Sequence, residues 1–96
     1  MECRALVFSG HAVQRMFERG IDEAHVRQVV ISGEVIADYP DDSPYPSRLL
    51  LGFVGERPLH VVLAIDSAGE RCYVITVYEP DPTQWEAGYR VRRRTQ

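Results

Sequence analysis

Three basic side chains recur at every fourth position in the stretch that is expected to form the first helix. His11, Arg15 and Arg19 stand at positions i, i+4 and i+8, and four helical residues advance by only about 40° beyond a full turn. They therefore form one stripe, on which a neutral histidine could accept a proton and two guanidinium groups could hold phosphate. The first-turn position of His11 favours this interpretation, because the positive end of the helix dipole disfavours imidazolium. The alternative is a solvated helix face with Glu18 as counter-ion.

A second polar group lies at the expected end of the last strand, in the sequence ITVYEPD (residues 75–81). It comprises Thr76, Tyr78 and Glu79. Hydroxyl groups at a strand end can bind phosphate oxygens, and a tyrosine can position a ligand or donate a proton. The alternative needs no function, since threonine is a good strand former and tyrosine suits the edge of a sheet.

Further basic residues could contact an RNA backbone. Residues 90–96 hold four arginines and no acid, directly after a tyrosine, which predicts either an RNA-contacting tail or a frayed end. Arg48 and His60, in the expected strands, would add to these RNA contacts if they share a face with the hydroxyl groups, but alternation alone does not fix the strand register. For His60, the other interpretation is a strand histidine whose hydrogen bonds are satisfied by its neighbours. The predicted RNA contacts are Arg48, His60, Arg90, Arg92 and Arg93.

Charge is distributed unevenly over the 96 residues. The 11 basic residues are all arginine, and the net charge of −3 combines 0 for residues 1–33, −7 for residues 34–89 and +4 for residues 90–96. The low net charge argues against wholesale wrapping of nucleic acid, but it leaves room for a local site for an anionic ligand.

Cysteine usage and hydropathy predict a cytoplasmic protein without a cofactor. The apolar runs are all shorter than the roughly 18 residues that span a membrane, and no secretory pattern begins the chain. Cys3 and Cys72 are too few and too far apart for a disulfide framework or a zinc knuckle, so we expect reduced, partly buried thiols. The three histidines are scattered, and no metal site is predicted.

Periodicity predicts a single α+β domain over residues 1–96 that begins with two short helices. These helices are expected at about residues 10–19 and 22–32, with Ser9 and Asp22 as N-caps and with Gly20 as a left-handed C-cap. They would form an αα-hairpin that covers one face of a sheet. The expected buried positions are Val13, Met16 and Phe17 in the first helix and Val26, Val29 and Val30 in the second.

The rest of the chain predicts an antiparallel sheet of three to five strands. A proline-rich loop over residues 39–47 is followed by strands at about 48–54, 59–66 and 72–79, joined by short turns. Residues 35–38 and 1–7 are candidates for the two further strands. Alternation assigns the last strand's residues to two faces, one with Tyr73, Ile75 and Val77 and the other with Cys72, Val74, Thr76 and Tyr78. Trp85 is expected to pack the returning tail against the sheet edge.

Motifs along nearly the whole chain resemble one family. The run FSGHAVQRMFERGI (residues 8–21), a second helix, three strands and ITVYEPD resemble the domain of unknown function 4258 family. That family is similar to small toxin-like folds related to RelE and barnase. Its hallmark histidine and arginine map onto His11 and Arg15, with Arg19 following, and its strand-end hydroxyl maps onto Thr76. The resemblance implies a bacterial toxin–antitoxin module whose antitoxin is a small zinc-finger protein.

The predicted function is that of a metal-independent ribonuclease of the mRNA interferase type. The 2′-hydroxyl of RNA attacks the adjacent phosphorus once a base has removed its proton. His11 is the predicted base, Arg15 and Arg19 stabilise the developing charge, and Thr76 with Tyr78 positions the phosphate or donates a proton. The alternatives are a non-catalytic domain that binds RNA or an antitoxin, and a structural subunit whose sheet edge pairs with a partner strand. A second copy of the chain is a further candidate partner.

Overall fold

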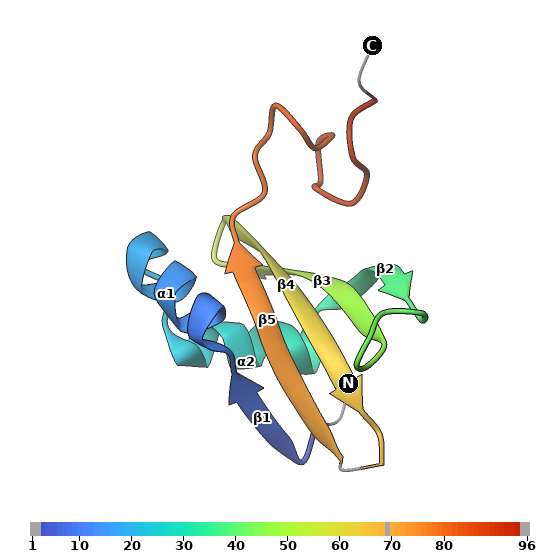
Figure 1. The fold of residues 1–96 in the computed structure, drawn as a ribbon. Helices are drawn as coiled ribbons and strands as arrows, with labels where there is room; N and C mark the ends of the chain where they lie inside the picture. The colour runs from blue at the N-terminus through green and yellow to red at the C-terminus, as the bar shows by residue number, and fades with distance from the viewer. Residues whose placement is uncertain (1–2, 69, 95–96) are drawn as a thin grey trace.

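Two helices and a five-stranded sheet make up the computed structural model, which describes residues 3–68 and 70–94. The strand order in the sheet is β1-β5-β4-β3-β2 (Figure 1), so the predicted α+β class is confirmed. The elements are β1 (Ala5–Phe8), α1 (Gly10–Arg19), α2 (Glu23–Ser32), β2 (Glu34–Tyr39), β3 (Ser47–Val54), β4 (Arg57–Asp66) and β5 (Arg71–Tyr78).

The sheet is mixed, which corrects the prediction of a purely antiparallel one. Strands β2 to β5 form the expected antiparallel meander, whereas β1 pairs in parallel with β5 along the sheet edge (Figure 1). Short turns favour antiparallel pairing only between strands that are joined as hairpins, and β1 leads into a helix instead. Leu6 and Phe8 lie opposite Cys72 and Val74 and pack against the core, which accounts for the position of β1.

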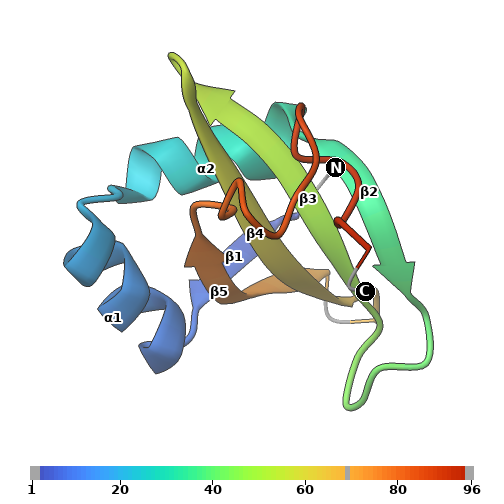
Figure 2. The same ribbon diagram turned by 90° about the horizontal axis from the view of Figure 1, so that it is seen from above.

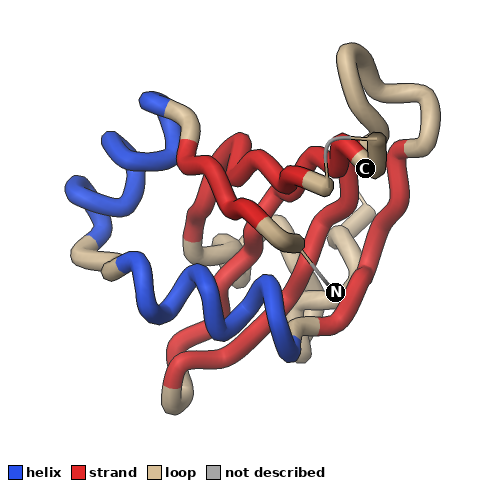
Figure 3. Tube along the Cα trace, turned by 90° about the horizontal axis from the view of Figure 1, so that it is seen from below, coloured by secondary structure: helices blue, strands red, loops and turns tan. Residues whose placement is uncertain are grey.

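The helix ends follow their sequence signals. Ser9 and Asp22 cap the two helices as predicted, each accepting a hydrogen bond from a backbone N–H three residues on, and Gly20 adopts the predicted left-handed conformation with a φ of 63°. Both helices lie on the same side of the sheet (Figure 3), α1 against β5 and α2 against β3 and β4. They contact the sheet far more than each other. The two helices therefore follow one another in the chain as predicted, but they do not pack together as an αα-hairpin.

Helix α1 is rotated relative to the prediction. Met16 is buried, but Val13 is 53% exposed and Phe17 is 89% exposed, while Ala12 is fully buried. The line of Ala12 and Met16 therefore faces the core. In helical projection this line adjoins the stripe that contains His11, so the stripe flanks the sheet instead of pointing directly away from it. The small side chain of Ala12 permits the close approach. In α2, the predicted Val26, Val29 and Val30 are all buried.

A β-bulge in β5 corrects the predicted alternation of its side chains. Val62 pairs with Thr76 and Leu63 pairs with Val74, so Ile75 is an extra residue in the ladder. Val74 therefore shares the helix-covered face with Val77, whereas Thr76 and Tyr78 lie on the opposite face, called the open face below. An inserted residue re-aims the side chains that follow it. Because of the bulge, Thr76 does not share the helix-covered face with Val74.

The C-terminal segment returns over the open face of the sheet (Figure 2). Trp85 pairs with Arg92 in an isolated bridge, and the N–H of Arg93 donates to the carbonyl of Gln84 at 2.8 Å. The frayed-end alternative is therefore wrong for the segment up to Arg93. Trp85 packs on the ring of His60 in β4 rather than at the predicted sheet edge. Residues 95–96 of the predicted tail lie outside the described residues.

The two cysteines form a disulfide, which corrects the prediction of reduced thiols. Cys3 and Cys72 are joined across 69 positions of sequence, with their Cα atoms 5.6 Å apart. Cys72 is 1% exposed and belongs to the core. Spacing in the sequence gave no sign of this contact, because the parallel pairing of β1 with β5 creates it. Neither of the two described helices is long and apolar enough to span a bilayer.

Candidate functional site

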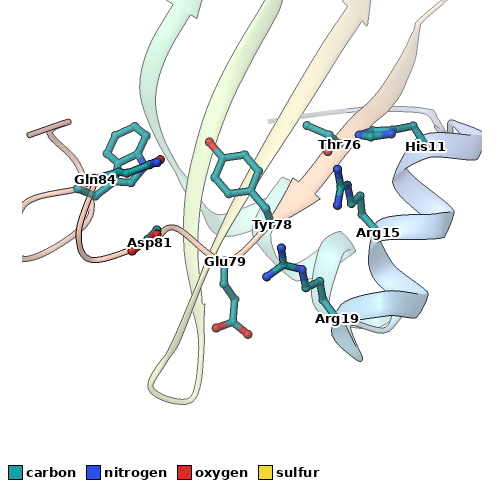
Figure 4. Close-up of a pocket in the computed structure, with 9 residues that line it drawn as sticks. His11, Arg15, Arg19, Thr76, Tyr78, Glu79, Asp81 and Gln84 are labelled. Atoms are coloured by element: carbon teal, nitrogen blue, oxygen red, sulfur yellow. The ribbon is translucent and has the colours of Figure 1, made fainter. Parts of the chain in front are cut away.

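A cavity of about 280 Å³, called the basic cavity below, opens between α1 and the end of β5 (Figure 4). The structure brings all five predicted catalytic residues to its walls. Three come from one face of α1 and two from the open face of β5, and the segment after β5 supplies the rest. The cavity is lined by His11, Arg15, Arg19, Thr76, Tyr78, Glu79, Asp81, Gln84 and Trp85.

Two features of the backbone join the two walls of this cavity. Ser9 anchors the start of α1 on β5, since its N–H donates to the carbonyl of Val74 at 3.1 Å and its hydroxyl donates to the carbonyl of Ile75 at 2.9 Å. The bulge at Ile75 then directs Thr76 onto the open face. His11, two residues after the N-cap, is thereby placed beside Thr76, toward which its ring points in Figure 4.

The α1 wall carries cationic side chains with few competing partners. Arg15 approaches Glu18 at 3.5 Å in an exposed ion pair, and such pairs contribute little to stability and exchange readily. Within the part of the chain that the structure describes, no carboxylate pairs with the Arg19 guanidinium. Figure 4 shows both guanidinium groups extending from α1 toward β5. This wall suits a planar anion such as a phosphate or carboxylate.

The opposite end of the cavity carries carboxylates. Glu79 pairs with Arg57, and Asp81 accepts hydrogen bonds at 2.8 Å from both the N–H and the hydroxyl of Thr83. These hydrogen bonds lower the pKa of Asp81, which keeps it ionised. The sequence analysis grouped Glu79 with the hydroxyl residues. It missed Asp81 and Gln84, because no periodicity in the proline-containing segment after β5 shows which way its side chains point.

Arg57 is a positioning residue that sequence reasoning also missed. From the start of β4, its guanidinium donates to the carbonyl of Gly20 at 3.1 Å, to the carbonyl of Arg19 and to the carboxylate of Glu79. The first two contacts satisfy carbonyl groups at the C-terminus of α1. Arg57 therefore connects the C-terminus of α1 to Glu79 after the end of β5. Ser9 makes the corresponding connection at the N-terminus of α1.

The hydroxyl of Tyr78 forms a hydrogen bond with His60, which is fully buried. The Nε2 of His60 lies 2.9 Å from the carbonyl oxygen of Tyr89, and its Nδ1 lies 3.1 Å from the Tyr78 hydroxyl oxygen. Because a carbonyl only accepts, Nε2 carries the proton and Nδ1 accepts the hydroxyl hydrogen of Tyr78. Burial lowers the pKa of His60 and raises the pKa of Tyr78, so both groups are neutral near pH 7.

The predicted RNA contacts do not gather in the basic cavity. Arg48 pairs with Leu63 in the ladder, on the helix-covered face, and lies 3.5 Å from Asp38. His60 is 0% exposed, so it supports the site from beneath and presents no atom to solvent. The three tail arginines contact other parts of the chain: Arg90 pairs with Glu34, Arg92 lies over the Trp85 ring and Arg93 donates to the carbonyl of Pro82.

The arrangement is that of an α+β domain with an open cavity, in which the cations of α1 lie across from Thr76 and suit an anionic ligand. Among residues 3–68 and 70–94, no three His, Cys, Asp or Glu side chains are grouped to hold a metal ion. The chain belongs to the family described as a domain of unknown function (DUF4258), whose model matches residues 8–79. This range includes both walls contributed by α1 and β5. No curated protein and no solved structure matches the chain.

Proposed function

We propose that the basic cavity binds the phosphodiester backbone of RNA and cleaves it without a metal ion, as a toxin of a bacterial toxin–antitoxin module does. The observation that carries the proposal is the convergence of His11, Arg15 and Arg19 on Thr76 in one cavity. The sequence motifs resemble the domain of unknown function 4258 family, and the similarity of that family to RelE-like and barnase-like toxins supports the same reaction.

The chemistry requires a base and stabilisation of charge. His11 accepts the proton of the 2′-hydroxyl, whose oxygen forms a bond to phosphorus while the bond from phosphorus to the 5′-oxygen breaks. Arg15 and Arg19 neutralise the charge that develops on the non-bridging oxygens. Thr76 offers a hydroxyl hydrogen to the same phosphate. The products are a 2′,3′-cyclic phosphate and a 5′-hydroxyl, and the leaving oxygen takes its proton from solvent in the open cavity.

Tyr78 acts as a wall of the site and not as its acid. Its hydroxyl hydrogen is directed at His60, and its side chain points away from the two arginines of α1 in Figure 4. Burial raises its pKa, which weakens it as an acid. Of the two roles predicted from sequence, positioning is therefore the one that we propose.

The test is incubation of the purified protein with single-stranded RNA in the presence of EDTA. We expect cleavage to persist in EDTA and to fall by at least about 100-fold in His11→Ala, the usual contribution of a general base. His25→Ala is the matched control, because His25 lies on α2 outside the basic cavity. Cleavage that stops in EDTA, or that His11→Ala leaves unchanged, would contradict the proposal.

Binding without cleavage is a second candidate function, and one observation favours it. Within the described residues, no side chain or backbone group hydrogen-bonds to the ring of His11, whereas a general base is usually oriented by a third group. In this case RNA or an acidic antitoxin segment docks on Arg15 and Arg19. The measurement is growth of bacteria that express the chain alone. Arrest relieved by a neighbouring gene supports the toxin, and harmless expression combined with RNA binding supports the binding domain.

A further inference from the structure

A second cavity of about 390 Å³, called the tail cavity below, lies on the open face of the sheet. Its volume is in the range of small-molecule sites. Strands β2 and β3 form its floor, and the C-terminal segment forms another wall. It shares two residues, Tyr78 and Trp85, with the basic cavity, so the two cavities adjoin. The tail cavity is lined by Ile36, Ala37, Tyr39, Leu49, Tyr78, Trp85, Arg90, Val91 and Arg92.

The walls of the tail cavity are held in place before any ligand binds. Arg90 donates to both carboxylate oxygens of Glu34, at 2.8 and 2.9 Å. The Arg92 guanidinium carbon lies 5.9 Å from the centre of the Trp85 ring, and that ring meets His60 edge-on at 4.5 Å. Preorganised walls lose little entropy on binding, which favours affinity.

The chemistry of this lining combines flat apolar surface with polar edges. Ile36, Ala37 and Leu49 provide the apolar surface. Tyr39 is 43% exposed, so its ring is available to a ligand. Ile36 is the extra residue of a bulge between Val35 and Ala37 and has no partner in the β3 register. An aromatic ring, aliphatic side chains and guanidinium groups together are the usual environment of an unstacked nucleobase.

We propose that the tail cavity binds one unpaired nucleobase of a ribonucleotide whose phosphate lies in the basic cavity. The shared wall of Tyr78 and Trp85 puts the two subsites next to each other, as a nucleotide requires. This inference rests on the proposed function, since it takes RNA as the ligand. It also assigns a role to Arg90 and Arg92, which the basic cavity does not use. The C-terminal segment is then part of the substrate site.

The experiment compares the affinities of adenosine 5′-monophosphate and ribose 5-phosphate, measured by NMR titration. The two probes share the sugar and phosphate and differ in the base. We expect the wild-type protein to bind the nucleotide about tenfold more tightly, as stacking on an aromatic side chain provides. Tyr39→Ala reduces this ratio to within about twofold, and the exposed Arg92→Ala gives a second variant if the first fails to fold. Arg15→Ala weakens both probes alike.

The matched control is Tyr45→Ala. Tyr45 stacks on Tyr73 with the ring centres 5.5 Å apart, and it lines neither cavity, so this variant retains the tenfold ratio. Equal affinity for both probes in the wild-type protein, or a ratio that survives in both folded variants, overturns the nucleobase subsite. If RNA is cleaved but the ratio is absent, the subsite is wrong and the proposed ribonuclease stands. If the ratio is present but RNA is not cleaved, the ribonuclease fails and the subsite stands.

Discussion

The hydroxyl of Ser9 donates a hydrogen bond to the carbonyl oxygen of Ile75 at 2.9 Å, which joins the first residue before α1 to the bulge of β5. The Ser9 hydroxyl oxygen in turn accepts a hydrogen bond from the N–H of Ala12 at 3.0 Å. One side chain therefore caps the helix and fixes it against the strand that carries Thr76. The relative position of the two walls of the basic cavity depends on this contact.

Ser9→Ala should lower the stability of the protein and weaken the site together. Loss of an N-cap costs about 1–2 kcal/mol of unfolding free energy, and we also expect weaker RNA binding because α1 is no longer fixed to Ile75. Chemical denaturation and an RNA titration measure the two effects. Ser32→Ala is the control, since its hydroxyl bonds only to the carbonyl of Gln28 within α2. A Ser9→Ala protein with unchanged stability would show that this contact is not made.

Local signals predicted the helix caps and the meander, but not the features that build the cavity. Ser9 and Gly20 were identified because capping needs only the residues near a helix end. The rotation of α1 was missed because Phe17 fits an apolar stripe better than Ala12 does, although the close packing on β5 selects the small residue. Tertiary packing overrode hydropathy in this helix.

The bulge at Ile75 and the return of the C-terminal segment depend on long-range pairing. Regular alternation assigned Thr76 to the face of Val74, and nothing in the residues between them marks an inserted position. The contacts of His60 with Tyr78 and Tyr89 span 18 and 29 positions. The sequence thus supplied the chemical groups of the basic cavity, and their convergence required the register of the sheet.

Arg57→Ala should weaken the connection between the C-terminus of α1 and the end of β5, which border the basic cavity. The guanidinium satisfies the carbonyl groups of Arg19 and Gly20 and pairs with Glu79, and hydrogen bonds that involve a charged group contribute about 1.5–3 kcal/mol each. We expect a loss of about 2 kcal/mol in unfolding free energy and weaker RNA binding. Arg4→Ala removes an exposed pair with Glu70 and should change stability by less than about 0.5 kcal/mol. Equal effects of the two substitutions would contradict the positioning role of Arg57.

Reduction of the disulfide should destabilise the fold without altering the site. The link between Cys3 and Cys72 spans 69 positions. In the chain-entropy model, closing a loop of this length raises the free energy of the unfolded chain by about 4 kcal/mol, because it lowers the conformational entropy of that chain. Thermal unfolding with and without dithiothreitol measures this difference. Cys3→Ala should behave like the reduced wild-type protein and show no further response to the reductant. RNA binding should persist in the reduced protein at temperatures where it remains folded, because neither cysteine lines the basic cavity.

The buried His60 should make stability fall as the pH decreases below about 6.5. Burial lowers its pKa in the folded protein from the ordinary value of 6.5, so the unfolded chain binds a proton at a higher pH than the folded chain does. The unfolding free energy is therefore fully retained above pH 6.5 and is lost progressively as the pH falls toward the folded pKa. Denaturation curves between pH 7.5 and about 5 measure this loss. In His60→Gln the slope over this range should be smaller than in the wild-type protein. Ser9→Ala, which is also destabilised but keeps His60, should retain the wild-type slope, and identical slopes in all three proteins would show that His60 does not titrate differently on folding.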